Sequence, residues 1–270
     1  MPTIRVACQT YTWEMQGDRW RGKVTDILDW IAAAGYAGIE ITCNMIGEFA
    51  KRPDDFIAEL QDRSLALACF AYSSPSGFTE SGSRSADLEG ALEAIEFVRQ
   101  FPEPRLGLGG AASFSREHAR AKLDVAISLY SEIGRAARAA GVSANVHPHS
   151  HHGSLLETAE EYDYLLSQLD PDCVSFGPDT GHIVRGGQDL MGCLSGQLDR
   201  ITHLHLKDAD ANRDWRPLGE GLCDFPGVLA LLQSSGYAGW LVAEEESAEA
   251  AADGVGAIRR NREYLRGLGC

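Results

Sequence analysis

The strongest constraint on the fold of this chain is a repeated alternation between two hydrophobic periods. Short apolar runs rich in β-branched residues, the pattern of strands buried on both faces, alternate with longer segments of helical period. The runs expected to form strands cover residues 4–9, 38–43, 65–71, 105–109, 142–147, 173–178, 201–207 and 239–244. Eight such rounds predict a parallel sheet that closes on itself, a single (β/α)8 TIM barrel domain over residues 1–270.

The segments between the runs are expected to be helices that cover the sheet. In GKVTDILDWIAAAG, Val24, Ile27, Leu28 and Ile31 follow the i, i+3, i+4, i+7 spacing of one helix face. Further helices are predicted at 53–64, 88–101, 116–141, 156–169, 190–199, 225–236 and within 249–268. No G-x-G-x-x-G motif follows the first run, which disfavours an open doubly wound sheet. The Gly/Ser-rich connection at 72–83 is interpreted as a lid over the barrel mouth or as an ordinary loop.

Charge and cysteine usage exclude several classes of function. The formal net charge of -15 repels phosphate backbones and no basic patch offsets it, so no nucleic-acid partner is expected. The chain has no run of about 18 apolar residues and no leader-like start, so no membrane association is expected. The seven cysteines are widely spaced without a C-x-x-C pair, which fits reduced thiols. The sequence therefore predicts a cytoplasmic globular enzyme.

Polar residues gather at the carboxyl ends of the predicted strands, the end of such a barrel that carries the active site. They are Glu40, His147, His149, Asp179, His182, His205, Lys207, Asp208 and Glu244. Because side chains alternate across a strand, His203, His205 and Lys207 share one face, as do His147 and His149. Taken alone, His203 or His205 would more often be a buried core residue than a metal ligand. Imidazoles and carboxylates from four strand ends together predict a site for a divalent metal ion.

Four motifs in the second half of the chain resemble those of a known family. They are D-T-G-H at 179–182, HLHLKD at 203–208, GEGLCDF at 219–225 and GYAGWLVAE at 236–244. The chain resembles the xylose-isomerase-like TIM barrels, which include ketose 3-epimerases, hydroxypyruvate isomerase, inosose dehydratase and isomerase, and endonuclease IV. The resemblance is strongest over residues 141–246 and rests mostly on strand rhythm before them.

The resemblance implies roles for individual residues. It implies that a divalent metal is held by Asp179, His205 and Glu244, and it places Asp208 behind these ligands. Glu246 replaces Glu244 as ligand if the strand register differs by two residues. His182 would contact the substrate. The endonuclease branch is disfavoured, because it needs histidines after the second and third strands and residues 40–47 and 69–76 contain none.

One position departs from the pattern of the epimerases. The pattern of those enzymes is G-V-x-x-x-x-E, which ends in a metal-bound glutamate. The similar segment of this chain is GVSANVH, which ends in His147. In the epimerases two such glutamates exchange protons on opposite faces of an enediolate, and a histidine breaks that symmetry. The run at 147–158 looks more like the inosose dehydratases and the enzymes that cleave 3-keto-glycosides. His147 is then the fourth metal ligand, with ligand and base roles open between His147 and His149, and Glu157 caps the next helix or is a first-turn acid.

The predicted reaction is metal-assisted removal of a proton α to a carbonyl, followed by β-elimination from a neutral keto-sugar or keto-inositol. Reprotonation of the same intermediate by an isomerase or epimerase is the alternative, and a non-catalytic partner subunit is a remote one. The expected partners are a small carbohydrate substrate and a second copy of the chain or a partner subunit. The catalytic candidates are His147, His149, His182 and Lys207. Substrate contacts are expected from Trp13, Glu40, His182 and Arg213, with Trp13 preferred over Trp215. Mn²⁺ is the expected metal, ahead of Co²⁺, Mg²⁺ and Zn²⁺.

Overall fold

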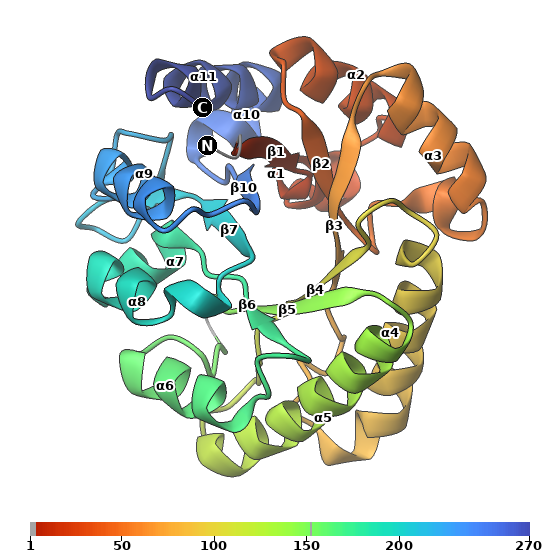
Figure 1. Cartoon of the computed structure of the whole chain (residues 1–270), viewed down its shortest axis with the longest axis vertical. Helices are drawn as coiled ribbons and strands as arrows, with labels where there is room; N and C mark the ends of the chain where they lie inside the picture. Colours follow the sequence, from red (N-terminus) through yellow and green to blue (C-terminus); the bar gives the residue numbers. More distant parts are fainter. Residues whose placement is uncertain (1–3, 152) are drawn as a thin grey trace.

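Eight parallel strands surround a central axis in the computed structural model, which describes residues 4–151 and 153–270 (Figure 1). They are β1 (Arg5–Gln9), β2 (Gly38–Thr42), β3 (Ala66–Tyr72), β4 (Arg105–Gly109), β5 (Ser143–His147), β6 (Ser175–Phe176), β7 (His203–Leu206) and β10 (Trp240–Ala243). Their order in the sheet is β6-β5-β4-β3-β2-β1-β10-β7. Parallel bridges from Phe176 to Ile201 and from Asp179 to His205 join β6 to β7. The predicted barrel fold is therefore confirmed, with each predicted strand in place.

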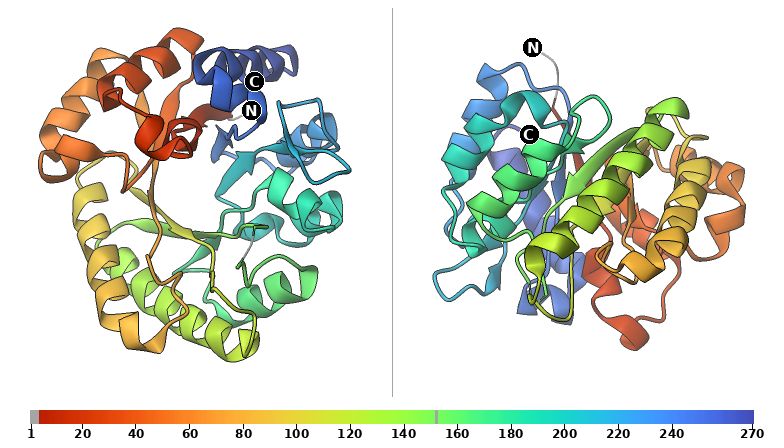
Figure 2. Two further views of the ribbon diagram at one scale, coloured as in Figure 1. Left: turned by 180° about the vertical axis from the view of Figure 1, so that it is seen from behind. Right: turned by 90° about the horizontal axis from the view of Figure 1, so that it is seen from below.

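The helices form an outer layer around the strands (Figure 2). The predicted ones are α2 (Val24–Ala34), α3 (Pro53–Asp62), α4 (Arg84–Val98), α5 (Ala119–Ala139), α6 (Ala159–Gln168), α8 (Leu190–Gly196), α9 (Phe225–Ser234) and α11 (Gly254–Gly267). In α2 the buried side chains include Ile27, Leu28 and Ile31, three of the four residues that predicted its apolar face. Among the described residues, no helix is both long and apolar enough to cross a bilayer.

Several short elements lie outside the predicted pattern. They are α1 (Tyr11–Glu14), α7 (Thr180–Arg185), α10 (Ala248–Ala252), the 3₁₀ turns η1 (Gly17–Arg19), η2 (Gly47–Lys51), η3 (Ser81–Ser83) and η4 (Leu198–Arg200), and the two-residue strands β8 (Asp208–Ala209) and β9 (Trp215–Arg216). None is long enough to show a hydrophobic period. Most of them follow the carboxyl ends of barrel strands, among them α1 after β1, α7 after β6, α10 after β10 and the antiparallel β8-β9 pair after β7. They therefore shape the end of the barrel that carries the predicted site.

The connection at 72–83 is packed into the protein, which does not fit its interpretation as a lid. Phe78 is 1% exposed, and its ring lies 5.0 Å from that of Tyr130. The backbone N–H of Ala112 donates to the carbonyl of Gly77 at 3.1 Å, and the Thr79 hydroxyl donates to the carbonyl of Ala112 at 2.7 Å. An aromatic anchor and these hydrogen bonds hold the connection against the segment that follows β4.

We expect a Gly77→Ala substitution to destabilise the protein more than Gly141→Ala. Both glycines have a left-handed backbone, with φ of +65° and +75°, and an alanine there costs about 1–2 kcal/mol in strain. A Cβ on Gly77 would also lie 2.1 Å from the backbone oxygen of Ala112, whereas a Cβ on Gly141 meets no atom of the described residues within 4 Å. Urea denaturation of the two variants measures the difference. Equal losses would contradict the close packing of this connection.

Candidate active site

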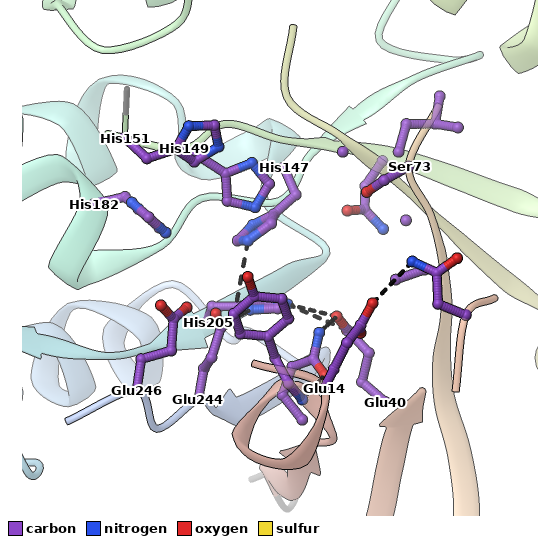
Figure 3. A pocket seen from close by; sticks show the side chains of 18 of the residues that line it. Glu14, Glu40, Ser73, His147, His149, His151, His182, His205, Glu244 and Glu246 are labelled. Carbon is purple, nitrogen blue, oxygen red and sulfur yellow. Dashed lines mark hydrogen bonds and ion pairs between the residues drawn. The ribbon is translucent and has the colours of Figure 1, made fainter. Parts of the chain in front are cut away.

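A cavity of about 500 Å³ opens at the carboxyl ends of the strands (Figure 3). Each of the eight barrel strands, or the segment that follows it, contributes to the wall: Gln9, Glu40, Ala71, Gly109, His147, His182 of α7, His205 and Glu244. This is the end of a (β/α)8 barrel at which active sites are built. The cavity lies where the strand-end residues were expected to converge.

The four residues predicted as metal ligands meet on one side of this cavity. Each of His147, Asp179, His205 and Glu244 offers one nitrogen or oxygen atom, and these atoms all lie within 4.8 Å of one another. The His205 Nδ1 is 2.5 Å from Glu244 Oε2, and the His147 Nε2 is 4.0 Å from the same oxygen. The residues come from four neighbouring strand ends, so their approach depends on closure of the barrel between β6 and β7.

Asp179 has an oxygen that the described residues leave without a hydrogen bond. Its Oδ1 accepts from the backbone N–H of His182 at 2.8 Å, while its buried Oδ2 has no partner there. Burial raises the pKa of Asp179 to about 7, against the lowering effect of the Lys207 charge. A buried carboxylate oxygen without a donor is costly unless a cation or a proton satisfies it. Asp179 is thus suited to bind a cation in the cluster.

The ring of His147 is held in one tautomer. Its Nδ1 lies 3.0 Å from the carbonyl oxygen of Gly177, which can only accept, so Nδ1 carries the proton. The lone pair of a neutral ring is then on Nε2, the atom nearer Glu244. Burial and the charge of His205 lower the pKa of His147 to about 3, which keeps it neutral at physiological pH. A neutral imidazole with its second N–H on a backbone carbonyl is the usual form of a metal-ligating histidine.

Glu40 of β2 lies next to the cluster, and both of its carboxylate oxygens contact protein groups. Gln9 Nε2 donates to Oε1 at 3.2 Å, His203 Nε2 lies 2.5 Å from Oε2, and His205 Nε2 lies 3.1 Å from the carboxylate. Burial alone would raise the pKa of Glu40, but the charges of His205 and His203 hold it well below its ordinary value. Glu40 was predicted to bind substrate. It lines the cavity, yet its contacts are to protein groups.

Lys207 is a buried cation between two carboxylates. Its Nζ is 3.0 Å from Glu244 Oε1, forms an ion pair with Glu246, and lies 3.4 Å from His182 Nε2. Burial would lower the pKa of Lys207, but Glu244 and Glu246 outweigh it and raise the pKa. Burial together with the charge of Glu244 raises the pKa of Glu246 to about 7, even though Lys207 opposes this. Sequence reasoning considered Glu246 only as a replacement for Glu244, since nothing in the sequence pairs it with Lys207.

Two further predicted histidines face the cavity as neutral rings. His182 Nδ1 accepts from the backbone N–H of Ser150 at 2.8 Å, so its proton is on Nε2, toward Lys207. The His149 ring lies 4.5 Å from that of His147 and 5.0 Å from that of His182. Burial lowers the pKa of both His149 and His182 well below the ordinary value, with help from His147 and Lys207 respectively.

Trp215 lines the cavity, whereas Trp13, the tryptophan preferred for that place, is in the core. Trp13 is 2% exposed and packs in the core, with its ring 5.7 Å from that of Trp30, instead of lining the cavity. Trp215 of β9 lines the cavity, with Lys207 Nζ 4.0 Å and the Arg185 guanidinium 4.5 Å from its ring. The helical turn α1 directs Trp13 inward. Trp215 could not be placed from the sequence because a two-residue strand carries no periodic signal.

Arg213, also predicted to bind substrate, lies beside the main cavity. Its guanidinium pairs with Glu157 and donates to the carbonyl of Arg185 at 2.8 Å. It lines an adjoining cavity of about 270 Å³, while Arg185 lines both. Glu157 precedes the N-cap of α6, and the helix is capped by a capping box of Thr158 and Glu161.

Asp208 holds the segment 209–223, which follows β7, through hydrogen bonds from the segment's backbone. Its buried carboxylate accepts from the backbone N–H groups of Ala209, Gly219, Gly221 and Cys223, at 2.9–3.0 Å. The GEG motif is thereby wrapped around the end of β7, next to the β8-β9 pair. Asp208 thus acts on the shape of the site through the backbone.

A family model described as xylose isomerase-like TIM barrel matches residues 28–268. The chain belongs to this family. Inosose dehydratase of Geobacillus thermodenitrificans is 33% identical over 161 residues, which is 53% of this chain and 53% of that protein. Inosose dehydratase of Lacticaseibacillus casei is 32% identical over 146 residues, 47% of this chain and 49% of the relative. The chain spans about half the length of the curated relatives it matches.

Solved structures with the same fold cover nearly the whole chain. The IolI protein with a bound zinc atom has a TM-score of 0.83 at 15% identity and covers 98% of each chain. The 3-keto-D-glucoside 4-epimerase from E. coli has a TM-score of 0.79 at 16% identity and covers 98% of this chain and 100% of its own. At these identities the likeness establishes the fold.

We expect Asp208→Asn to destabilise the protein by about 1–3 kcal/mol, because an amide turns an N–H₂ group toward backbone donors that now reach a carboxylate. The matched control is Asp224→Asn, since Asp224 accepts one backbone N–H at the exposed start of α9, where asparagine caps equally well. Urea denaturation measures both. A loss of the same size in the two variants would contradict the role assigned to Asp208.

Proposed function

We propose that this protein is a metal-dependent carbon–oxygen lyase that acts on a keto-inositol or keto-sugar, including 3-keto-glycosides. One observation carries the choice of elimination: the ring of His147, with its tautomer fixed by Gly177, occupies the side of the cluster that faces Glu244. An epimerase needs two comparable groups at these places to exchange protons on opposite faces. The similarity to inosose dehydratases supports the same choice.

The residues of the cluster fit a divalent metal ion. Neutral Nε2 of His147, the unpartnered Oδ2 of Asp179, His205 and Glu244 would hold it. Two imidazoles and two carboxylates suit Mn²⁺, Co²⁺ or Zn²⁺, with Mn²⁺ the first choice, and the zinc of the IolI structure supports a divalent ion in this fold. When bound, such an ion polarises the substrate carbonyl and stabilises the negative charge that develops there.

The surrounding side chains supply the proton transfers. His149 takes the proton from the carbon α to the carbonyl on its Nδ1, which in the structure receives a long hydrogen bond of 3.4 Å from the backbone N–H of Gly110. The electron pair left on that carbon forms a double bond and expels the β-oxygen. The Nε2–H of His182 donates its proton to this oxygen, which leaves as water or as the alcohol of a glycoside, and the Lys207 ammonium gives a proton back to Nε2, so that His182 remains a neutral imidazole. The face of Trp215 binds the ring of the substrate.

Isomerisation or epimerisation through the same intermediate is the second candidate. The observation that favours it is Glu246, a carboxylate at the cavity with a pKa raised to about 7, which can return a proton to carbon. The product distribution separates the two reactions.

We expect the metal-loaded enzyme to convert an inosose or a 3-keto-glucoside into an unsaturated product in D₂O, as followed by NMR. Treatment with a chelator should abolish the conversion and Mn²⁺ should restore it, because the cluster needs the ion to stabilise charge. Deuterium gained at the α carbon with the carbon skeleton and its oxygens intact would show an isomerase or epimerase instead. Full activity after metal removal would contradict the proposed metal dependence.

The substitution His147→Glu tests the asymmetry of the site. We expect it to slow elimination and to increase deuterium exchange at the α carbon, since it places carboxylates on both sides of the cluster. His147→Ala is the control. Its activity should fall by about 10–100-fold or more, the loss that is typical when a metal site is disturbed. NMR progress curves measure both variants. A fully active His147→Ala protein would contradict the role of His147 as ligand.

A further inference from the structure

We propose that Glu40 is a positioning residue that orients the ring of His205, so that His205 presents Nδ1 and not Nε2 to the metal. This inference rests on the metal site of the proposed function and adds to it a residue on the strand opposite the ligands. Figure 3 shows Glu40 joined to His205 by the contacts that carry the proposal.

The ring of His205 spans two carboxylates. Its Nε2 lies 3.1 Å from the Glu40 carboxylate, and its Nδ1 lies 2.5 Å from Glu244 Oε2. A carboxylate that is ionised only accepts, so Nε2 carries a proton toward Glu40. By the same argument Nδ1 donates to Glu244 when no ion is bound, so both nitrogens then carry protons. The Nδ1 proton is the one that points at a ligand carboxylate of the cluster, so a metal ion held by Glu244 would take its place and leave the Nε2 proton on Glu40.

Glu40 is itself held in place, as a positioning residue must be. It is 3% exposed, and Gln9 and His203 bind its oxygens at 3.2 and 2.5 Å. His203 and His205 are each 1% exposed, so neither ring can turn without breaking these contacts in a packed interior. A carboxylate that accepts from the second ring nitrogen of a metal-ligating histidine typically raises the metal affinity about 10–100-fold.

Two other roles for Glu40 fit the structure less well. Substrate binding fits less well because Glu40 is 3% exposed and both of its oxygens already accept from protein donors. A second metal site is the other role, because Glu40, His203 and His205 offer ligand atoms within 4.8 Å of one another. At 2.5 and 3.1 Å, however, the imidazole nitrogens already lie at hydrogen-bond distance from the carboxylate. The two roles therefore become outcomes of the test.

The test compares Co²⁺ binding to Glu40→Gln with that to Glu14→Gln, after chelator treatment and without substrate. Glu14 is a matched control, because its carboxylate lines the same cavity and accepts from Thr42 at 2.6 Å and Asn44 at 2.8 Å. Competition with a chromophoric chelator measures the Kd. We expect one Co²⁺ per chain in the parent protein, a Kd raised about 10–100-fold in Glu40→Gln, and an unchanged Kd in Glu14→Gln.

The unaltered protein provides a second measurement that does not depend on folding of a variant. In the Zn²⁺-loaded protein, ¹⁵N NMR of the histidine rings should show His205 with its proton on Nε2 and the metal on Nδ1. The opposite arrangement would overturn the proposal, as would an unchanged Kd in Glu40→Gln. Two Co²⁺ per chain, of which Glu40→Gln loses one, would make Glu40 a ligand instead. A parent protein that binds no Co²⁺ overturns the proposed metal site as well.

Discussion

The site depends on a buried row of alternating charges that crosses the carboxyl end of the barrel. Glu40 contacts His205, His205 contacts Glu244, Glu244 contacts Lys207, and Lys207 contacts Glu246. A buried charge is tolerated only when it is paired, so each of these side chains depends on the next. The row joins β2 to β7 and to the end of β10. The geometry of the candidate metal site therefore depends on the same contacts that hold these strands together.

Much of this arrangement could be predicted because it follows from two simple periods. The strands are buried on both faces, so their apolar runs stand out, and the alternation of side chains placed His205 and Lys207 on one face. Parallel strands bring their carboxyl ends to one edge, which made Asp179 and Glu244 neighbours of His205 although they lie far apart in the chain. The four residues expected as ligands were found together for this reason.

Other features depend on single contacts that no pattern encodes. The direction of Trp13 is set by the four-residue turn α1, and the position of Trp215 by the two-residue pairing of β8 with β9. The tautomer of His147 depends on the carbonyl of Gly177, thirty positions along the chain. The partners of Glu40 likewise come from β1 and β7, and no pattern in the sequence pairs it with them.

The two sides of the candidate metal site differ in charge, and this difference bears on the choice of reaction. On one side Glu244 and Glu246 flank the Lys207 cation, while on the other His147 and His149 are neutral rings whose pKa values burial holds low. Proton exchange on both faces of a planar intermediate favours two groups of similar basicity. Elimination instead needs one group that accepts a proton from carbon and a different one that donates to oxygen. A site with unlike sides suits the second requirement, and in the proposed elimination the donor is His182, whose N–H lies next to Lys207.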